Sequence, residues 1–389
     1  MSLAAWPVAP ASAPDSVCKR RLFCLAPCPP LLIWHKGRML FLVRSPCGMW
    51  LERSQWLMED TLKMKALVYE GVETLRIREV AKPQASEDQS LVRIVASGIC
   101  GSDMHAYLGH DERRPAPLIL GHEAAGVIEG GARDGERVSI NPLVSCGACA
   151  ACRAGRQNLC PERMIISLPP REGAFAQYVA MHNDNLIPVP DHVPLEKAAL
   201  AEPLSVSWHS ARLGLAALDR ALGTSALVVG GGAIGLAAAL ALKAQGLEDV
   251  TIAEPNDARR AFLIERCGQQ VVPSSAGQYA IVVDAVGYAA TRAIASERCC
   301  PGGVIVHIGL GEDLGGLDVR RMTLQEITFI GTYTYTPQDF RDTCAAIYDG
   351  SLGPLDWTEQ RSLEAGAQAF ADLRTGNVAA PKIILDPWA

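Results

Sequence analysis

The chain has 389 residues, of which 49% are hydrophobic and 20% are charged, and its formal net charge is -6. This length suits two domains, and the composition is typical of a globular protein with a large buried core. A nucleic-acid-binding surface is normally basic and rich in arginine, so the acidic balance argues against a nucleic-acid partner. No apolar run reaches the roughly 18 residues that a membrane-spanning helix needs, so no membrane partner is expected either.

The first 63 residues differ in composition from the rest of the chain. They contain four of the 13 cysteines, many prolines and tryptophans, and few acidic residues. A basic, acid-poor segment is typical of a transit peptide, but prolines interrupt any amphipathic helix here. From Met64 onward, apolar and polar residues alternate as they do in a strand. We therefore expect the functional protein to begin near Met58 or Met64, with residues 1–63 disordered or derived from a non-native start site.

Three further segments follow, and their patterns indicate two folded domains of the α/β class. Residues 64–205 contain short strand-like runs separated by glycine and proline, a pattern that predicts an antiparallel, barrel-like β domain. Residues 206–335 alternate apolar strands with helices, which predicts a doubly wound domain on a parallel sheet. Residues 336–389 end in the strand-like run PKIILDP, which we expect to return to the first domain.

A glycine-rich turn stands between the first strand and the first helix of the second domain. Gly230, Gly232 and Gly235 form the pattern G-x-G-x-x-G, with Ile234 inside it. The first glycine permits a tight turn, the second lets the backbone approach a pyrophosphate, and the third allows the helix to pack closely on the strand. The start of the helix adds free N–H groups that face the phosphates. This arrangement predicts a dinucleotide-binding site.

The kind of dinucleotide depends on the residues that follow the next strand. Glu254 ends that strand about 20 residues after the glycines, where a carboxylate accepts a hydrogen bond from a ribose 2′-hydroxyl. A 2′-phosphate would meet the same carboxylate and be repelled, so NAD is expected. Arg259 and Arg260 follow closely and leave NADP open as the less favoured cofactor.

The first domain contains side chains of the three kinds that bind catalytic zinc. Cys100 and the adjacent pair His122 and Glu123 lie in glycine-rich segments, and Glu202 follows at the end of the domain. A thiolate, an imidazole and a carboxylate suit tetrahedral zinc with one position left open for a substrate. Zinc in such a site acts as a Lewis acid that lowers the pKa of an alcohol.

These segments occur in the order, and near the spacing, found in the zinc-dependent medium-chain alcohol dehydrogenase family. The resemblance rests on GICGSDMH, GHEAAGVI, the four-cysteine run, AEPLSV and GGGAIGL, covers residues 64–389 and is closest to the sorbitol and threonine dehydrogenase branch. It implies a GroES-like catalytic barrel, a Rossmann nucleotide domain and the oxidation of a secondary alcohol or polyol by NAD. It leaves open the oxidation of a hydroxy-amino acid or a sugar acid, and a relative of the quinone-reductase type that binds a dinucleotide without oxidising alcohols.

The same resemblance implies roles for the candidate metal ligands. Cys100 and His122 match two ligands of the catalytic zinc, and Glu123 takes the third protein position in the sorbitol and threonine branch. Glu202 stands where the alcohol dehydrogenase branch places a cysteine ligand, and would contact zinc directly or through its water. Which of the two glutamates binds stays open, with Glu123 slightly favoured.

Ser102 and His105 resemble the proton relay of the family. In that relay a hydroxyl at the substrate oxygen passes a proton through the cofactor ribose to an imidazole that faces solvent. Asp103 would orient the zinc-binding imidazole. Ala106 stands where sorbitol-like members often carry a substrate-contacting tyrosine, so sorbitol itself is not the expected substrate.

The run CGACAACRAGRQNLC contains four cysteines at the spacing C-x2-C-x2-C-x7-C. A disulfide framework needs an oxidising compartment, and the sequence has no usable secretory signal. Adjacent C-x2-C steps suit four thiolates around one ion, and the family carries a structural zinc lobe at this place. We expect a structural zinc, and therefore two zinc ions per chain, with a role in stability rather than chemistry. The expected ligands are Cys146, Cys149, Cys152 and Cys160.

The resemblance also implies an assembly and a location. Most members are dimers or tetramers that pair their nucleotide domains edge to edge, so a homodimer or homotetramer is expected. Without a secretory signal, the expected location is the cytoplasm, and the remaining expected partner is a small alcohol substrate.

Overall fold

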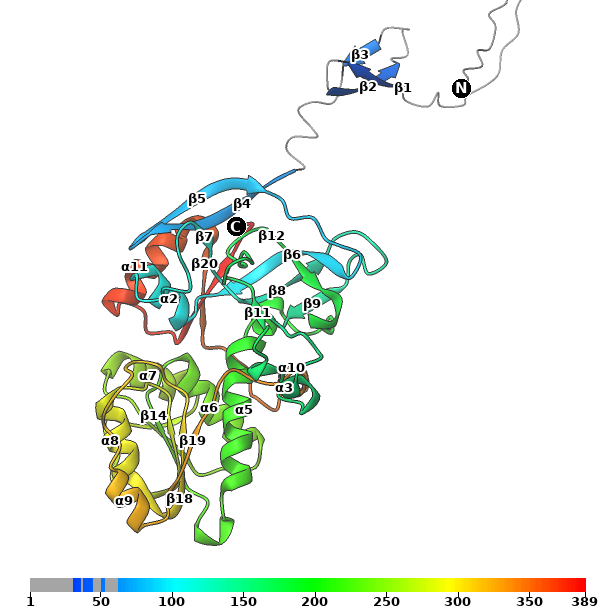
Figure 1. Ribbon diagram of the computed structural model, residues 1–389. Helices are drawn as coiled ribbons and strands as arrows, with labels where there is room; N and C mark the ends of the chain where they lie inside the picture. Colours follow the sequence, from blue (N-terminus) through cyan, green and yellow to red (C-terminus); the bar gives the residue numbers. More distant parts are fainter. Residues whose placement is uncertain (1–30, 36–37, 45–49, 53–61) are drawn as a thin grey trace, which may run out of the picture. The chain divides into compact units, whose positions relative to one another are not determined.

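The computed structural model describes residues 31–35, 38–44, 50–52 and 62–389. The chain divides into a unit of residues 1–60 and a unit of residues 61–389. In the first unit, β1 (Leu31–His35), β2 (Arg38–Arg44) and β3 (Trp50–Glu52) form an antiparallel sheet (Figure 1). The predicted disorder or non-native start of residues 1–63 falls mostly outside the described residues and stays a prediction.

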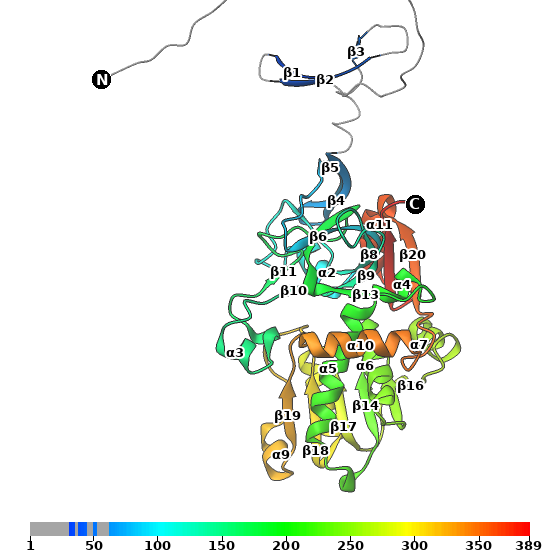
Figure 2. The same cartoon turned by 90° about the vertical axis from the view of Figure 1, so that its right-hand side faces the viewer.

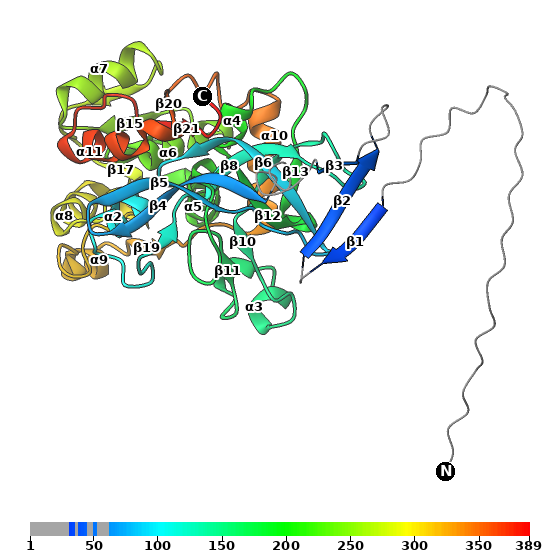
Figure 3. The same ribbon diagram turned by 90° about the horizontal axis from the view of Figure 1, so that it is seen from above.

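The barrel half of the second unit, residues 62–200 and 349–389, is built on two main sheets (Figures 1 and 3). One has the strand order β5–β4–β7, and the other has the order β13–β9–β8–β6–β21–β20, with β12 also paired to β6. Val92, Ile94 and Ala96 of β6 are buried at alternate positions, as expected for a strand with one face on the core. The strands are β4 (Lys63–Gly71), β5 (Thr74–Ala81), β6 (Gln89–Gly98), β7 (Leu118–Ile119), β8 (Glu123–Ile128), β9 (Arg137–Ile140), β10 (Leu143–Val144), β11 (Met164–Ile165), β12 (Tyr178–His182), β13 (Leu186–Pro188), β20 (Thr358–Ser362) and β21 (Lys382–Asp386).

One pair in these sheets is an exception to the antiparallel pattern. β20 and β21 run parallel, with Thr358 opposite Lys382. Parallel neighbours need a crossover connection, and α11 (Gly366–Thr375) provides it. β21 then pairs antiparallel with Ser97 and Gly98 at the end of β6. The last strand of the chain therefore lies in the same sheet as strands formed about three hundred residues earlier. The barrel half also contains α2 (Gly101–Tyr107), α3 (Ala150–Arg153) and α4 (Leu195–Ala198).

The nucleotide half, residues 201–348, is a parallel sheet with the strand order β16–β15–β14–β17–β18–β19. Numbered from its own first strand this order is 3-2-1-4-5-6, the order of the Rossmann fold. Figure 1 shows α8 and α9 on one side of the sheet and α5 on the other, so the predicted doubly wound fold is confirmed. The elements are α5 (Ala201–Ala217), β14 (Ala226–Val229), α6 (Ala233–Ala244), β15 (Val250–Ala253), α7 (Asp257–Glu265), β16 (Gln270–Val272), β17 (Tyr279–Asp284), α8 (Ala289–Arg298), β18 (Cys299–His307), α9 (Val319–Leu324), β19 (Thr328–Gly331) and α10 (Pro337–Tyr348).

The two halves share one hydrophobic core. Ala96 and Ala125 of the barrel sheet belong to the same buried cluster as Leu204 of α5 and Ile281 of β17. The predicted boundary at residue 205 falls inside α5, and the predicted boundary at residue 335 precedes α10, which packs against α5. Within the part of the chain that the structure describes, no helix combines the length and the apolar character needed to cross a bilayer.

A buried carboxylate joins α10 to α5. Asp339 is 1% exposed, lies 2.7 Å from His209 Nδ1, and accepts a hydrogen bond of 2.7 Å from Arg212 Nε. It also accepts hydrogen bonds from the backbone and the hydroxyl of Thr336, which caps α10. Burial alone would raise the pKa of Asp339, but these partners outweigh burial and hold the pKa well below its usual range.

We expect the substitution Asp339→Ala to lower the free energy of unfolding by about 3 kcal/mol, because it leaves buried partners of the carboxylate unpaired. Urea denaturation at neutral pH measures this loss.

The lowered pKa of Asp339 means that its charged carboxylate stabilises the fold above its unfolded pKa of about 4, and that this contribution disappears as the pH falls. The stability difference between the wild type and Asp339→Asn should therefore shrink below about pH 4, and a constant difference would contradict the assignment.

Candidate functional site

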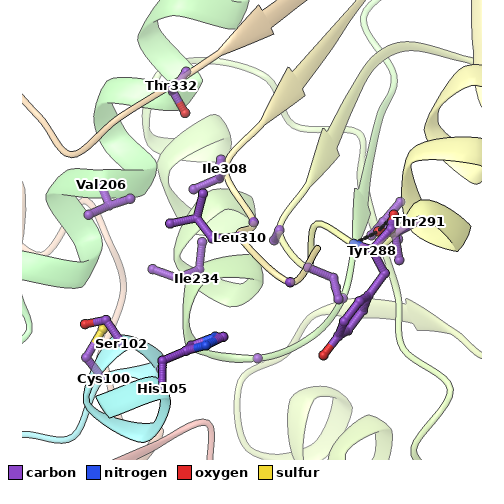
Figure 4. Close-up of a pocket in the computed structure, with 18 of the residues that line it drawn as sticks. Cys100, Ser102, His105, Val206, Ile234, Tyr288, Thr291, Ile308, Leu310 and Thr332 are labelled. Carbon is purple, nitrogen blue, oxygen red and sulfur yellow. Dashed lines mark hydrogen bonds between the residues drawn. The ribbon is translucent and has the colours of Figure 1, made fainter. Parts of the chain in front are cut away.

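A cleft of about 920 Å³ opens between the barrel half and the nucleotide half. Figure 4 shows Cys100, Ser102 and His105 of α2 on one side of it and Tyr288 and Thr291 at the start of α8 on the other. Ile234, Ile308 and Leu310 lie between these two groups, and Val206 lies near Cys100 and Ser102. All the predicted cofactor residues except Gly235, and all the predicted catalytic residues, line this cleft.

Three candidate metal ligands meet at the barrel side of the cleft. The ligand atoms of Cys100, His122 and Glu123 all lie within 4.8 Å of one another. Oε2 of Glu123 is buried and has no hydrogen-bond partner among the described residues. An unpartnered buried carboxylate oxygen is costly, and a metal ion would satisfy it. A thiolate, an imidazole and a carboxylate at this separation therefore fit a zinc ion.

Local structure explains how Cys100 and His122 come together. Cys100 is the N-cap of α2, and its N–H donates to Asp103 in a capping box. The carboxylate of Asp103 also accepts from the N–H of Gly121 and lies 3.5 Å from His122 Nδ1. Ser167 Oγ is near the same ring nitrogen, at 3.4 Å. Nε2 is thus the ring nitrogen available to a metal, and Asp103 fixes the orientation of the ring.

Glu123 is held by a buried lysine that the sequence analysis did not identify. Lys382 Nζ donates to Glu123 Oε1 at 2.6 Å and to the carbonyl oxygen of Ile99 at 2.9 Å. Lys382 is 3% exposed and Glu123 is fully buried. The available signal was a lysine directly before the apolar residues IIL of the strand KIILD, because a charge in a buried strand requires a partner.

Glu202, the other candidate glutamate, is close to this cluster but is not among its three ligands. It lies in the first turn of α5, and Tyr335 donates its hydroxyl to Glu202 Oε1 at 3.0 Å. Burial, together with the charge of Glu123, raises the pKa of Glu202 to about 7. Tyr335 was also missed, because nothing in its local sequence, TYTYTP, distinguishes it from an ordinary core tyrosine.

The two predicted relay residues differ in exposure. Ser102 is partly buried and lines the cleft, one turn before His105 on α2. His105 is exposed, and its ring extends toward the middle of the cleft in Figure 4. Tyr107, on the same helix, is buried against Phe370 with ring centroids 5.2 Å apart. It therefore belongs to the barrel core.

The glycine-rich turn has the geometry that dinucleotide binding requires. Gly230 has a φ of +95°, which other residues adopt rarely. A Cβ at Gly235 would lie 1.8 Å from the carbonyl oxygen of Gly230, so only glycine lets α6 pack this close to the strand. Gly232 is the N-cap of α6 and faces open space, and Ile234 lines the cleft beside it. The free N–H groups of the first turn of α6 are therefore accessible to an anion.

Glu254 directly follows β15 and is held in a fixed position beside the glycine-rich turn. It is 5% exposed and accepts hydrogen bonds of 2.8 Å from the N–H groups of Gly231 and Asn256. The guanidinium of Arg259 is 3.9 Å from Glu254 Oε2. A carboxylate held in this way keeps lone pairs for the hydroxyl groups of a ribose.

The four cysteines of the lobe at residues 146–160 also converge. Their sulfur atoms lie within 4.8 Å of one another, and three of the pairs are 3.5, 3.5 and 3.9 Å apart. A disulfide would need about 2.05 Å, whereas sulfurs around zinc with bonds of about 2.3 Å lie about 3.8 Å apart. Backbone N–H groups of Ala148 and Cys149 lower the pKa of the Cys146 thiol to about 6. At Cys160 the N–H of Cys146 is outweighed by burial and by the Cys146 thiol, which raise the pKa to about 11. The cluster therefore fits one zinc ion bound by thiolates.

Two family models match the chain: the alcohol dehydrogenase GroES-like domain over residues 86–191 and the zinc-binding dehydrogenase domain over residues 233–348. Sorbitol dehydrogenase of Bacillus subtilis is 38% identical over 200 residues, which are 49% of this chain and 56% of that protein, little more than half its length. Sorbitol dehydrogenase of Arabidopsis thaliana is 31% identical over 294 residues, which are 68% of this chain and 79% of that protein.

A similar solved structure is that of a short chain alcohol dehydrogenase from Escherichia coli CFT073, complexed with NADH. It aligns with a TM-score of 0.75 and 25% identity, over 84% of this chain and 99% of that one. Each of the two domain models covers residues that line the cleft. The chain belongs to the zinc-dependent medium-chain alcohol dehydrogenases, as an oxidoreductase of their polyol branch that acts on CH–OH donors.

Proposed function

We propose that this protein oxidises a secondary alcohol or polyol to the carbonyl compound, with transfer of a hydride to NAD and release of a proton. The observation that carries the proposal is the buried, unpartnered Oε2 of Glu123 beside Cys100 and His122, in the same cleft as the glycine-rich turn. These three residues would hold a zinc ion, which would supply a Lewis acid that makes a substrate hydroxyl more acidic. Glu202, with its raised pKa and its hydrogen bond from Tyr335, stays outside the ligand set.

The remaining residues position the substrate and move its proton. Ser102 Oγ would accept the proton of the substrate hydroxyl while its own proton passes through the cofactor ribose to His105, which is exposed and would release a proton to solvent. Asp103 holds the ring of His122, and Lys382 holds Oε1 of Glu123, so that both ligands keep their geometry during turnover. The apolar residues across the cleft exclude water from the reacting carbon.

The glycine-rich turn and Glu254 bind NAD. The N–H groups at the start of α6 would donate hydrogen bonds to the pyrophosphate, and Glu254 would accept hydrogen bonds from the adenosine ribose. Arg259 partly offsets the charge of Glu254, which leaves NADP as the weaker cofactor.

A second substrate class is favoured by the charge at the cleft wall. Arg113 and Arg114 both line the cleft and share the single carboxylate of Asp111, at 2.8 and 2.7 Å. Two guanidinium groups with one carboxylate leave a net positive charge, which attracts an anionic substrate. A sugar acid is an anion, and a hydroxy-amino acid carries a carboxylate although its net charge is zero, whereas a neutral polyol has no charged group.

We further propose a cytoplasmic homodimer or homotetramer. β19 is an edge strand of the parallel sheet, and Phe329 on it and Val319 and Leu324 on the neighbouring α9 are 36%, 66% and 67% exposed. Exposed apolar residues along a sheet edge suit pairing with a second copy. The thiolates of the cysteine lobe require a reducing compartment, which supports the cytoplasm.

The reaction class is tested with the zinc-loaded protein, NAD and a panel of secondary alcohols, sugar alcohols, aldonates and hydroxy-amino acids. We expect NADH formation, followed by its absorbance, with neutral secondary alcohols or polyols, and about two zinc ions per chain by metal analysis. A preference for aldonates or hydroxy-amino acids would show that the substrate carries a carboxylate, as in the second candidate function. If no NADH forms and the protein binds one zinc ion or none, the proposal is wrong, and the protein is a relative that binds a dinucleotide without oxidising alcohols.

The assignment of the catalytic metal predicts the effect of Cys100→Ser. Loss of the thiolate should reduce bound zinc from about two to about one per chain and lower kcat by more than about a hundredfold. The melting temperature should stay within a few degrees of the wild type, because the cysteine lobe is untouched. Cys267→Ser, which removes a thiol outside both clusters, is the control. Full zinc content and wild-type kcat in Cys100→Ser would refute the ligand set.

Cofactor choice should depend on Glu254. The substitution Glu254→Ser removes the carboxylate that repels a 2′-phosphate, so the ratio of kcat/KM for NAD over NADP should fall by at least about tenfold. Glu248→Ser, which removes an exposed acid just before β15, should leave the ratio unchanged. A wild-type enzyme that prefers NADP would contradict this role of Glu254.

A further inference from the structure

The segment 332–335, which joins β19 to α10, carries backbone strain inside the cleft. Its four residues, Thr332 to Tyr335, all line the cleft. Thr334 has a φ of +46°, which is costly for a β-branched residue, and its buried Oγ1 has no hydrogen-bond partner among the described residues. Such a conformation persists only where the surrounding structure holds it.

The two ends of the segment are fixed to the nucleotide half and to the site. At its start, the N–H of Thr332 donates to the carbonyl oxygen of His307 at 3.0 Å, and its hydroxyl lies 2.8 Å from Ser210 Oγ. At its end, Tyr335 is 1% exposed and donates to Glu202, as described above. Tyr333 and Thr334 stand between these anchors.

Tyr333 is held from the outside by the cysteine lobe. Asn158 Nδ2 donates to the carbonyl oxygen of Tyr333 at 2.8 Å, and the guanidinium of Arg163 lies over the Tyr333 ring, 5.0 Å from its centroid. Asn158 is 2% exposed, and Arg163 Nη1 donates to the carbonyl oxygen of Cys160 at 2.8 Å. Both side chains are therefore fixed by the folded lobe, two and three residues from a cysteine of the cluster. Figure 2 shows the lobe around α3 beside the segment that joins β19 to α10.

We propose that Asn158 and Arg163 are positioning residues for the substrate cleft. Through Tyr333 they hold the segment 332–335 in its strained conformation, which keeps the hydroxyl of Tyr335 on Glu202 beside the candidate metal ligands. The four-cysteine cluster thereby affects the geometry of the cleft as well as the stability of its own loop, which revises the purely stabilising role expected from the sequence. The inference rests on the proposed function insofar as this segment borders the bound substrate.

The test compares the zinc-loaded variants Asn158→Ala and Arg163→Ala with the wild type. Amide hydrogen exchange over residues 328–337 should become faster in both variants, because the segment loses an external contact. Bound zinc should stay at about two per chain, and the dissociation constant of NADH should stay within about twofold, because neither residue contacts the glycine-rich turn. With the best substrate of the panel, kcat/KM should fall by about three- to tenfold, the size expected from one lost hydrogen bond or cation–π contact.

Matched variants distinguish positioning from a general loss of structure. Arg156→Ala removes an exposed cation of the same lobe and should match the wild type in every measurement. Arg163→Lys keeps a cation over the ring of Tyr333 and should recover part of kcat/KM. If Asn158→Ala causes the lobe to lose its zinc, the result for Arg163→Ala decides the test, because Arg163 is exposed.

Two outcomes separate this inference from the proposed function. Unchanged exchange over residues 328–337 and unchanged kcat/KM in Arg163→Ala would overturn the inference while leaving the dehydrogenase assignment intact. A wild type that oxidises no alcohol, with faster exchange in both variants, would overturn the proposed function and retain the link between the lobe and the segment.

Discussion

A buried negative charge must be paired, and this constraint shapes the catalytic end of the molecule. Glu123 is fully buried, and its neighbours are arranged around its two oxygens: Lys382 donates to Oε1, and Oε2 is left for a metal ion. A carboxylate in this position without a partner would cost several kcal/mol. The ion pair therefore joins β8 to β21, the last strand of the chain, and the metal site exists only where these two meet.

The cleft follows from the way in which two sheets of different kinds share one core. The antiparallel sheet places Cys100, His122 and Glu123 at the ends of strands and at the start of α2, while the parallel sheet places the glycine-rich turn and Glu254 at the carboxyl ends of its strands. Ligands of open parallel sheets bind at these strand ends. Since α5 and α10 pack together and lie in the core that the halves share, the reacting groups and the cofactor site face each other.

Much of the fold and of the candidate site could be predicted from local patterns. The fold class is confirmed, because strand period and glycine spacing are short-range features of the sequence, whereas the strand order 3-2-1-4-5-6 is known only from the structure. The ligand clusters could be anticipated because their residues stand in short motifs. The structure brings together the cysteines of the lobe, and it also groups Cys100, His122 and Glu123.

The contacts that could not be predicted are those between distant segments. Lys382 and Glu123 are 259 positions apart, Tyr335 and Glu202 are 133 apart, and Asn158 and Tyr333 are 175 apart. No periodicity or spacing connects such pairs, because each is created by packing of elements whose relative position one sequence does not specify. The parallel pairing of β20 with β21 was missed for the same reason, since α11 resembles an ordinary terminal helix.

The antiparallel pairing of β21 with the end of β6 has a consequence for synthesis on the ribosome. The nucleotide half is encoded between these two strands, so it emerges and can fold while Ser97 and Gly98 still lack their partners on β21. An unpaired strand edge invites association with other chains. The barrel half is therefore most prone to aggregation after the nucleotide half has been synthesised and before β21 has emerged from the ribosome.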